Sequence, residues 1–144
     1  HKIAGAAADA GAPLVEVAKI ARKAAAAVGT MGVALRACQL PGSSERDDRI
    51  KQGTMEVGLG IHGEPGAMVS VLKPVDAVVD QLLEMITSQE EGRGYLSLLP
   101  GQRVALLINN LGGTTQIELA LATRRAIGTL KKEYQVQVCR CYCG

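Results

Sequence analysis

Aromatic side chains are nearly missing from this 144-residue sequence, which contains no Phe, no Trp and only three Tyr. Proteins that bind single-stranded nucleic acids stack bases on such rings, so we expect no nucleic-acid partner. The net charge of +2, from 16 basic and 14 acidic residues, gives no reason to expect a polyanion or an anionic membrane surface. The length fits one compact domain, whose core must be aliphatic.

Long apolar runs are missing too. None approaches the roughly 20 residues that span a bilayer. The Ala-rich start carries Lys2 and Asp9 and has no signal-peptide pattern. We therefore expect a protein of the cytoplasm that does not enter a membrane.

Three of the four cysteines, Cys139, Cys141 and Cys143, alternate with other residues. Alternation predicts that they share one face of a strand, about 7 Å apart from one to the next and beyond disulfide reach. Reduced, buried thiols are the preferred interpretation, as is usual in the cytoplasm. A zinc site on the three thiols is the alternative, although paired CxxC motifs are missing.

Apolar residues at three- and four-residue spacing predict helices. A short Ala-rich helix should end at Gly11, and an amphipathic helix should start at Pro13 and be capped by Gly29. A third helix should begin near Pro74 and end in SQEEGRG, and a fourth should cover residues 114–132, capped by a threonine.

Strands are expected between these helices. We predict a short buried strand in 31–38, an alternating strand from residue 55 that ends at His62, an interior strand in the aliphatic run 102–108, and a last strand in 134–143. No strand is predicted after Pro65. The pattern predicts an α/β fold, a mixed β-sheet covered by helices, with functional loops at strand ends.

Histidine is scarce, because His1 and His62 are the only two. A catalytic triad, a Cys–His pair or a histidine metal site would almost have to use His62. This residue lies in the segment GLGIHGEPGA, in which Gly58 and Gly60 weaken a strand unless something approaches that face closely. A ligand or a packed helix would explain both glycines.

Other motifs fit less well. Glu56 and Glu64 could join His62 at a metal ion, but their spacing is unfamiliar, and we expect no metal ligands. GLGIHG lacks the following helix of a dinucleotide-binding motif, since Pro65 comes soon after it. The segment NNLGGTT has no P-loop lysine, so a strand-to-helix turn is preferred to a phosphate site.

Four segments in order, HKIAGAAA, GTMGVAL, GTMEVGLGIHGEPG and VALLINNLGGTTQIELAL, resemble the DhaK-type substrate-binding domain of the dihydroxyacetone kinase (glycerone kinase) family, which includes triokinase/FMN cyclases. The resemblance covers nearly the whole chain. It implies that residues 1–144 are the second α/β subdomain of that domain, truncated at both ends.

That family transfers a phosphoryl group to dihydroxyacetone from ATP or, in some bacteria, from a phosphoprotein. The resemblance implies that a neutral imidazole nitrogen of His62 adds to the ketone carbon and forms a hemiaminal. Histidine has an ordinary pKa of about 6.5, so the ring is largely neutral in the cytoplasm. Gly60 and Gly63 would let a three-carbon substrate reach the ring. Glu64 is expected to order the loop or to be solvated, and Asn110 to shape a turn.

Several family features have no counterpart in these residues: an upstream glycine-rich loop with another histidine, an aspartate base, and the domain that binds ATP and Mg. The resemblance therefore implies one part of a glycerone kinase for dihydroxyacetone or glyceraldehyde, inactive alone and dependent on an upstream subdomain and a downstream ATP-binding domain. A homodimer stays open. The alternatives are a non-catalytic binding or assembly module, or part of a bifunctional kinase that also cleaves FAD to cyclic FMN.

Overall fold

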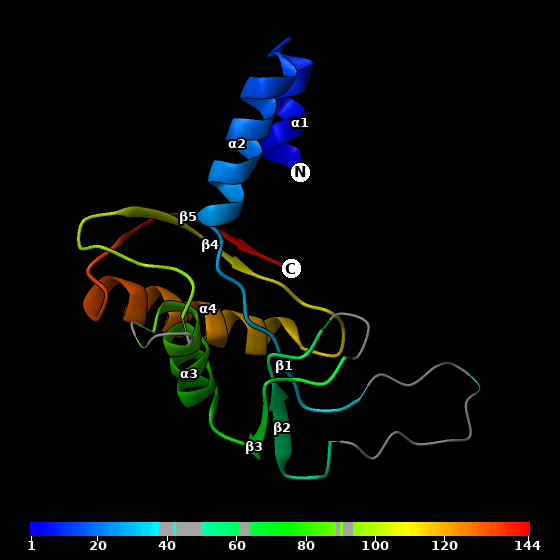
Figure 1. Cartoon of the computed structure of the whole chain (residues 1–144). Coiled ribbons are helices and arrows are strands. Elements are labelled where there is room, and N and C mark those ends of the chain that lie inside the picture. Colours follow the sequence, from blue (N-terminus) through cyan, green and yellow to red (C-terminus); the bar gives the residue numbers. More distant parts are fainter. Residues whose placement is uncertain (38–41, 43–49, 61–63, 89, 91–93) are drawn as a thin grey trace. The chain divides into compact units, whose positions relative to one another are not determined.

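The computed structural model describes residues 1–37, 42, 50–60, 64–88, 90 and 94–144 (Figure 1). The elements in chain order are α1 (Lys2–Asp9), α2 (Leu14–Ala26), β1 (Val33–Ala34), β2 (Thr54–Val57), β3 (Met68–Val71), α3 (Val75–Thr87), β4 (Arg103–Ile108), α4 (Gln116–Lys132) and β5 (Gln137–Cys143). They fall into two compact units, His1–Thr30 and Met31–Gly144, rather than the single core that the length predicts.

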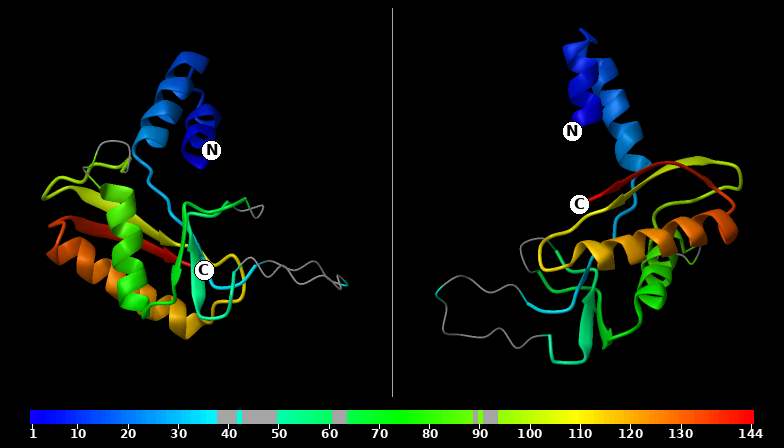
Figure 2. Two further views of the ribbon diagram at one scale, coloured as in Figure 1. Left: turned by 60° about the horizontal axis from the view of Figure 1, so that its bottom comes forward. Right: turned by 180° about the vertical axis from the view of Figure 1, so that it is seen from behind.

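The first unit is the pair of helices α1 and α2, which pack side by side (Figure 2). Gly11, with φ +82°, turns the chain between them, as its position in the sequence predicts. The second helix ends earlier than expected, with Ala27 rather than Gly29 as its C-cap. The reason is that the N–H groups of Ala27 and Val28 bond three residues back, which tightens and closes the last turn. Neither helix contains a buried residue.

The second unit contains an antiparallel sheet in the order β1-β2-β3. Its middle strand is deeply buried, with Met55 and Val57 fully inaccessible. The predicted end of this strand at His62 is wrong, because β2 stops at Val57. Gly58 has φ +78° and donates its N–H to the Gly32 carbonyl at 2.7 Å, which turns the chain out of the extended conformation.

Two further expectations about this sheet need correction. The strand predicted in 31–38 is only two residues long and half-buried. Strand β3, which pairs with β2 through Val57↔Met68 and Thr54↔Val71, was not predicted. Three of its four residues are exposed, so the strand has no buried face to produce an alternating pattern.

The second unit also contains a parallel pair of strands, β4 and β5, connected through α4. Helices α3 and α4 pack together, and α4 lies along the sheet (Figures 1 and 2). The core between them consists of aliphatic residues of both helices and of the segment before β5: Val79, Leu83, Ala126, Leu130 and Val136. Strand β4 is not interior as predicted, since Leu107 on its other face is 67% exposed.

A β-bulge interrupts the pairing of β4 with β5. Val104 pairs with Val138, but the next residue, Ala105, pairs with Arg140. Cys139 is thereby left without a counterpart and contacts Arg103, whose Nε–H donates to its Sγ at 3.2 Å. The contact raises the pKa of Arg103.

The bulge separates the three cysteines. Cys141 and Cys143 pair with Leu106 and Ile108, which pack against the core, whereas Cys139 is on the opposite face with Arg103. The prediction that all three thiols share one face is therefore wrong, and the zinc alternative loses the arrangement on which it rested. All three are free thiols, as predicted. Cys141 and Cys143 are exposed rather than buried, and Cys139 is half-buried.

The α/β fold predicted from the sequence is confirmed, with helices packed on a sheet. In the described part of the chain its antiparallel and parallel strands belong to two separate small sheets. None of the helices in these residues is long and apolar enough to cross a membrane.

Candidate functional site

The segment that connects β2 to β3 carries most of the predicted site residues. Residues 61–63, with His62 and Gly63, lie outside the described residues, whereas Gly60 and Glu64 on either side are described. The structure therefore describes the chain on both sides of the predicted nucleophile.

Gly58 is the first residue after β2, and its position requires glycine for two reasons. Its φ of +78° is unfavourable for residues with a side chain. A Cβ at this position would also lie 3.1 Å from Ala67 Cβ and 3.2 Å from Met31 Sδ. The close approach anticipated from the sequence is thus made at Gly58 by two neighbouring segments of the chain, and neither is a helix.

Gly60 and Glu64 are the described residues nearest to His62, and they bond to each other. The Gly60 N–H donates to the Glu64 carbonyl oxygen at 3.3 Å. The exposed Glu64 side chain folds back so that a Cβ on Gly60 would overlap its carboxylate. The space that Gly60 leaves is filled by Glu64 in this structure. The substrate-binding role of Gly60 and the supporting role of Glu64 stay predictions.

Glu56 holds the part of this segment that leads back to the sheet. Its side chain is buried, 2% exposed, and Oε1 accepts the Gly66 N–H at 2.6 Å. The two residues are in close contact, because a Cβ on Gly66 would lie 2.9 Å from Glu56 Cγ and 2.5 Å from the Val57 carbonyl oxygen. Sequence reasoning considered Glu56 only as a metal ligand. The sequence carries no signal for this contact, because strand alternation places Glu56 on one face of the strand but does not give its partner.

The segment NNLGGTT forms the strand-to-helix turn that the sequence favours. Asn110 Oδ1 accepts the Gly112 N–H at 3.0 Å, and its Nδ2 donates to the Thr114 carbonyl oxygen at 2.9 Å. Thr115 then begins α4 with a capping box. Hydrogen bonds from the Thr115 hydroxyl and backbone lower the pKa of Glu118. These contacts favour the turn-forming role predicted for Asn110.

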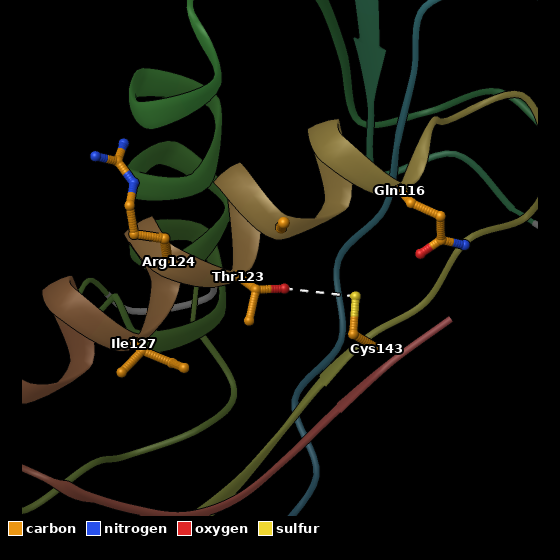
Figure 3. Close-up of a pocket in the computed structure, with 6 residues that line it drawn as sticks. Gln116, Thr123, Arg124, Ile127 and Cys143 are labelled. Atoms are coloured by element: carbon orange, nitrogen blue, oxygen red, sulfur yellow. Dashed lines mark hydrogen bonds between the residues drawn. The ribbon is translucent and has the colours of Figure 1, made fainter.

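An open hollow of about 450 Å³ lies between α4 and the end of β5 (Figure 3). Its lining is mostly apolar and includes Ala120 and Ile127. Thr123 Oγ1 donates to Cys143 Sγ at 3.5 Å, and Arg124 is already bound to Asp76 at 2.8 and 3.1 Å. Of the predicted site residues that the structure describes, Gly60, Glu64 and Asn110, none lines this hollow. The described ranges contain no group of three His, Cys, Asp or Glu side chains that could hold a metal ion.

A second polar cluster connects α3 to α4. Arg125 donates to both oxygens of Asp80, at 2.9 Å from Nε and 2.5 Å from an Nη, and Thr129 Oγ1 donates to Asp80 Oδ1 at 2.9 Å. The hydrogen bond from Arg125, more than that from Thr129, lowers the pKa of Asp80. Because Asp80 on α3 accepts hydrogen bonds from both Arg125 and Thr129 on α4, we interpret this cluster as a structural link, or clasp, between the two helices.

Comparison with known proteins identifies the family of this α/β chain. The sequence profile of the Dak1 domain matches residues 1–144. The chain belongs to the Dak1 domain family, as its motifs predict.

Three relatives illustrate the family. A Solanum lycopersicum protein with the provisional name 3,4-dihydroxy-2-butanone kinase is 49% identical over 144 residues, which are 100% of this chain and 24% of that protein. Human triokinase/FMN cyclase is 36% identical over 131 residues, 91% of this chain and 22% of that protein. The dihydroxyacetone-binding subunit DhaK of a PTS-dependent kinase from Listeria innocua is 39% identical over 118 residues, 82% and 34% of the two chains. The chain thus spans about a quarter of the first two relatives.

Solved structures agree. The dihydroxyacetone kinase of C. freundii, in complex with AMP-PNP and Mg²⁺, superposes with a TM-score of 0.74 and 34% identity, over 93% of this chain and 24% of that one. The dihydroxyacetone kinase operon co-activator DhaQ superposes with a TM-score of 0.81 and 27% identity, over 100% and 42%. Use of ATP and Mg²⁺ in the kinase family follows from the first structure.

Proposed function

We propose that this chain is part of the substrate-binding domain of a cytoplasmic kinase that phosphorylates dihydroxyacetone, glyceraldehyde or a related short ketose with ATP. The family match over residues 1–144 carries the proposal. The similarity to a subunit named for dihydroxyacetone binding favours a role in holding the ketose rather than ATP.

In this proposal His62 is the covalent anchor of the substrate. The unprotonated ring nitrogen uses its lone pair to bond to the carbonyl carbon, and the C=O electron pair moves to the oxygen. The proton on the second ring nitrogen passes to that oxygen, so that a neutral hemiaminal forms without a leaving group. Glycerol has no electrophilic carbon and cannot form this bond. The anchor therefore selects ketoses and aldehydes over polyols.

The remaining tasks belong to residues outside this chain. ATP and Mg²⁺ supply the phosphoryl group, and we propose that a further domain binds them. The rest of the ketose pocket comes from an upstream subdomain, and residues 1–144 alone do not phosphorylate. Similarity over about a quarter of the length of two relatives supports this division of labour. A homodimer is compatible with it.

The test is the exchange His62→Ala in the full-length protein, with phosphorylation of dihydroxyacetone as the readout. We expect a loss of at least about 100-fold, because the ketose is no longer held in line for transfer. The matched control is His1→Ala, which removes the other histidine of residues 1–144 and should leave the rate unchanged. A wild-type rate in His62→Ala would exclude the covalent anchor.

A second candidate is a binding module without phosphoryl transfer. It is favoured by the similarity to an operon co-activator over the whole chain. This candidate predicts that the full-length protein binds dihydroxyacetone but does not consume ATP with it. The name of the human relative also suggests an FMN cyclase activity, for which release of cyclic FMN from FAD is the assay.

A further inference from the structure

The carboxyl group of Glu56 occupies an unusual place for an acid. It lies in the middle strand of the antiparallel sheet, paired with Ala34 on one side and Val69 on the other. Its side chain is only 2% exposed, and Met55 and Val57 beside it are fully buried. Burying a carboxyl group costs free energy unless a hydrogen bond compensates. A carboxyl group at this position therefore needs a hydrogen-bond partner that offsets the free-energy cost of its burial.

That partner is the backbone of the segment that carries His62. Glu56 Oε1 accepts the Gly66 N–H at 2.6 Å, across ten residues of sequence. This hydrogen bond supplies the compensation that burial of the carboxyl group requires. The contact cannot shift easily, since Gly66 packs directly against Glu56 Cγ and the Val57 carbonyl oxygen.

The other end of the segment is fixed independently. Gly58 donates its N–H to the Gly32 carbonyl oxygen at 2.7 Å and packs against Ala67. Between the two ends, Gly60 bonds to Glu64. Both ends of the segment are thus attached to the sheet by described residues: Gly58 through its own backbone and Gly66 through the side chain of Glu56.

We propose that Glu56 is a positioning residue for the reaction of His62: it attaches Gly66, four residues after His62, to the middle strand, and binding of the ketose depends on that attachment. This inference rests on the proposed role of His62 as the nucleophile. Addition to a carbonyl is sensitive to position, since a displacement of about 1 Å costs on the order of 100-fold in rate.

Two variants of the full-length protein distinguish the effect of the length of the Glu56 side chain from the effect of its charge. Glu56→Gln keeps the length of the side chain and an oxygen that accepts the Gly66 N–H, whereas Glu56→Asp keeps the charge but is one methylene too short. If the contact positions the segment, the Gln variant keeps wild-type behaviour and the Asp variant loses it. If the charge itself mattered, the order would be reversed.

The readout is the ¹³C NMR spectrum of dihydroxyacetone labelled at its carbonyl carbon. Formation of the hemiaminal moves the signal from the carbonyl to the tetrahedral region, and titration gives an apparent affinity. We expect Glu56→Gln within about twofold of wild type and Glu56→Asp weaker by about 10-fold to 100-fold. Met55→Leu is the matched control, because it changes a buried residue of the same strand while keeping its apolar character and approximate volume.

Hydrogen exchange of the peptide that contains Gly66 is the second measurement, and it applies even to a destabilised variant. Exchange should be faster in Glu56→Asp and unchanged in Glu56→Gln. Equal affinity and equal exchange in all variants would overturn the positioning role while leaving His62 in place. Absence of the tetrahedral signal in the wild type would instead overturn the proposed function.

Discussion

Two parts of the second unit are held in different ways. Around α3, α4, β4 and β5, the fold depends on burial of aliphatic side chains such as Leu83, Ala126 and Leu130. Between β2 and β3 it depends on close backbone approach at Gly58 and Gly66 and on one buried carboxylate. We infer that the helical layer is the scaffold and that the β2–β3 connection is the functional part.

Loss of the scaffold core should have the largest effect on stability. Leu130, 4% exposed, lies in the cluster between the helices and the sheet. We expect Leu130→Ala to lower the free energy of unfolding by about 2–5 kcal/mol, because it removes transfer free energy and leaves a cavity. Chemical denaturation of the full-length protein is the measurement.

Leu107→Ala is the control for this change, because the side chain is 67% exposed and the effect should stay within about 0.5 kcal/mol. Under conditions where both variants are folded, ketose affinity should match the wild type. Equal destabilisation by the two substitutions would contradict the division into scaffold and functional part.

A methyl group on Gly66 should affect the functional part more than the fold. Its Cβ would lie 2.5 Å from the Val57 carbonyl oxygen, so the segment must move. We expect Gly66→Ala to cost about 1–3 kcal/mol of unfolding free energy and to abolish the hemiaminal signal. The pair of measurements, denaturation and ¹³C NMR, distinguishes the two effects.

Gly128→Ala in α4 is the matched glycine control. Nothing lies within 4 Å of its added Cβ, and alanine is the better helix former, so stability should rise by up to about 1 kcal/mol with the adduct intact. Loss of the adduct in this variant, or its retention in Gly66→Ala, would argue against a special role for the β2–β3 connection.

The clasp between α3 and α4 should have the smallest effect. The Asp80 and Arg125 side chains are 37% and 40% exposed, so solvent screens the pair, and Asp80→Asn should cost no more than about 1 kcal/mol at neutral pH. Because folding lowers the pKa of Asp80, its contribution is complete above the ordinary value of 3.8 and is lost as the pH falls through the folded-state pKa.

Denaturation from neutral pH down to about 2.5 tests the clasp. The curves of wild type and Asp80→Asn should converge in acid. Asp76→Asn, which removes the more exposed pair with Arg124, should have a smaller effect. A difference that persisted unchanged into acid would exclude the ion pair as its cause.

The same comparison explains what the sequence predicts and what it does not. Helix α3 and the threonine cap of α4 follow from local rules, namely apolar spacing and capping residues, and the sequence predicts both. Strand β3 and the bulge at Cys139 depend on pairing with distant strands, which leaves no periodic trace in the sequence. The early end of β2 could be predicted only in part. The sequence shows a glycine at position 58, but it does not show that this glycine adopts a positive φ.

The candidate site also has parts that the sequence predicts and parts that it does not. The scarcity of histidine and the family motifs select His62, and the turn at Asn110 follows from its glycines and threonines. The contact of Glu56 with Gly66 could not be predicted from spacing, because strand alternation assigns Glu56 a face but not a partner ten residues away. The fold supplies that partner when β3 pairs with β2.

The most direct test of the account is a crystal structure of the full-length protein soaked with dihydroxyacetone. We predict continuous electron density between a ring nitrogen of His62 and the central carbon of the ketose, with the Glu56 carboxylate on the Gly66 N–H. A ketose bound without a bond to His62, or bound away from the 58–66 segment, would contradict the account.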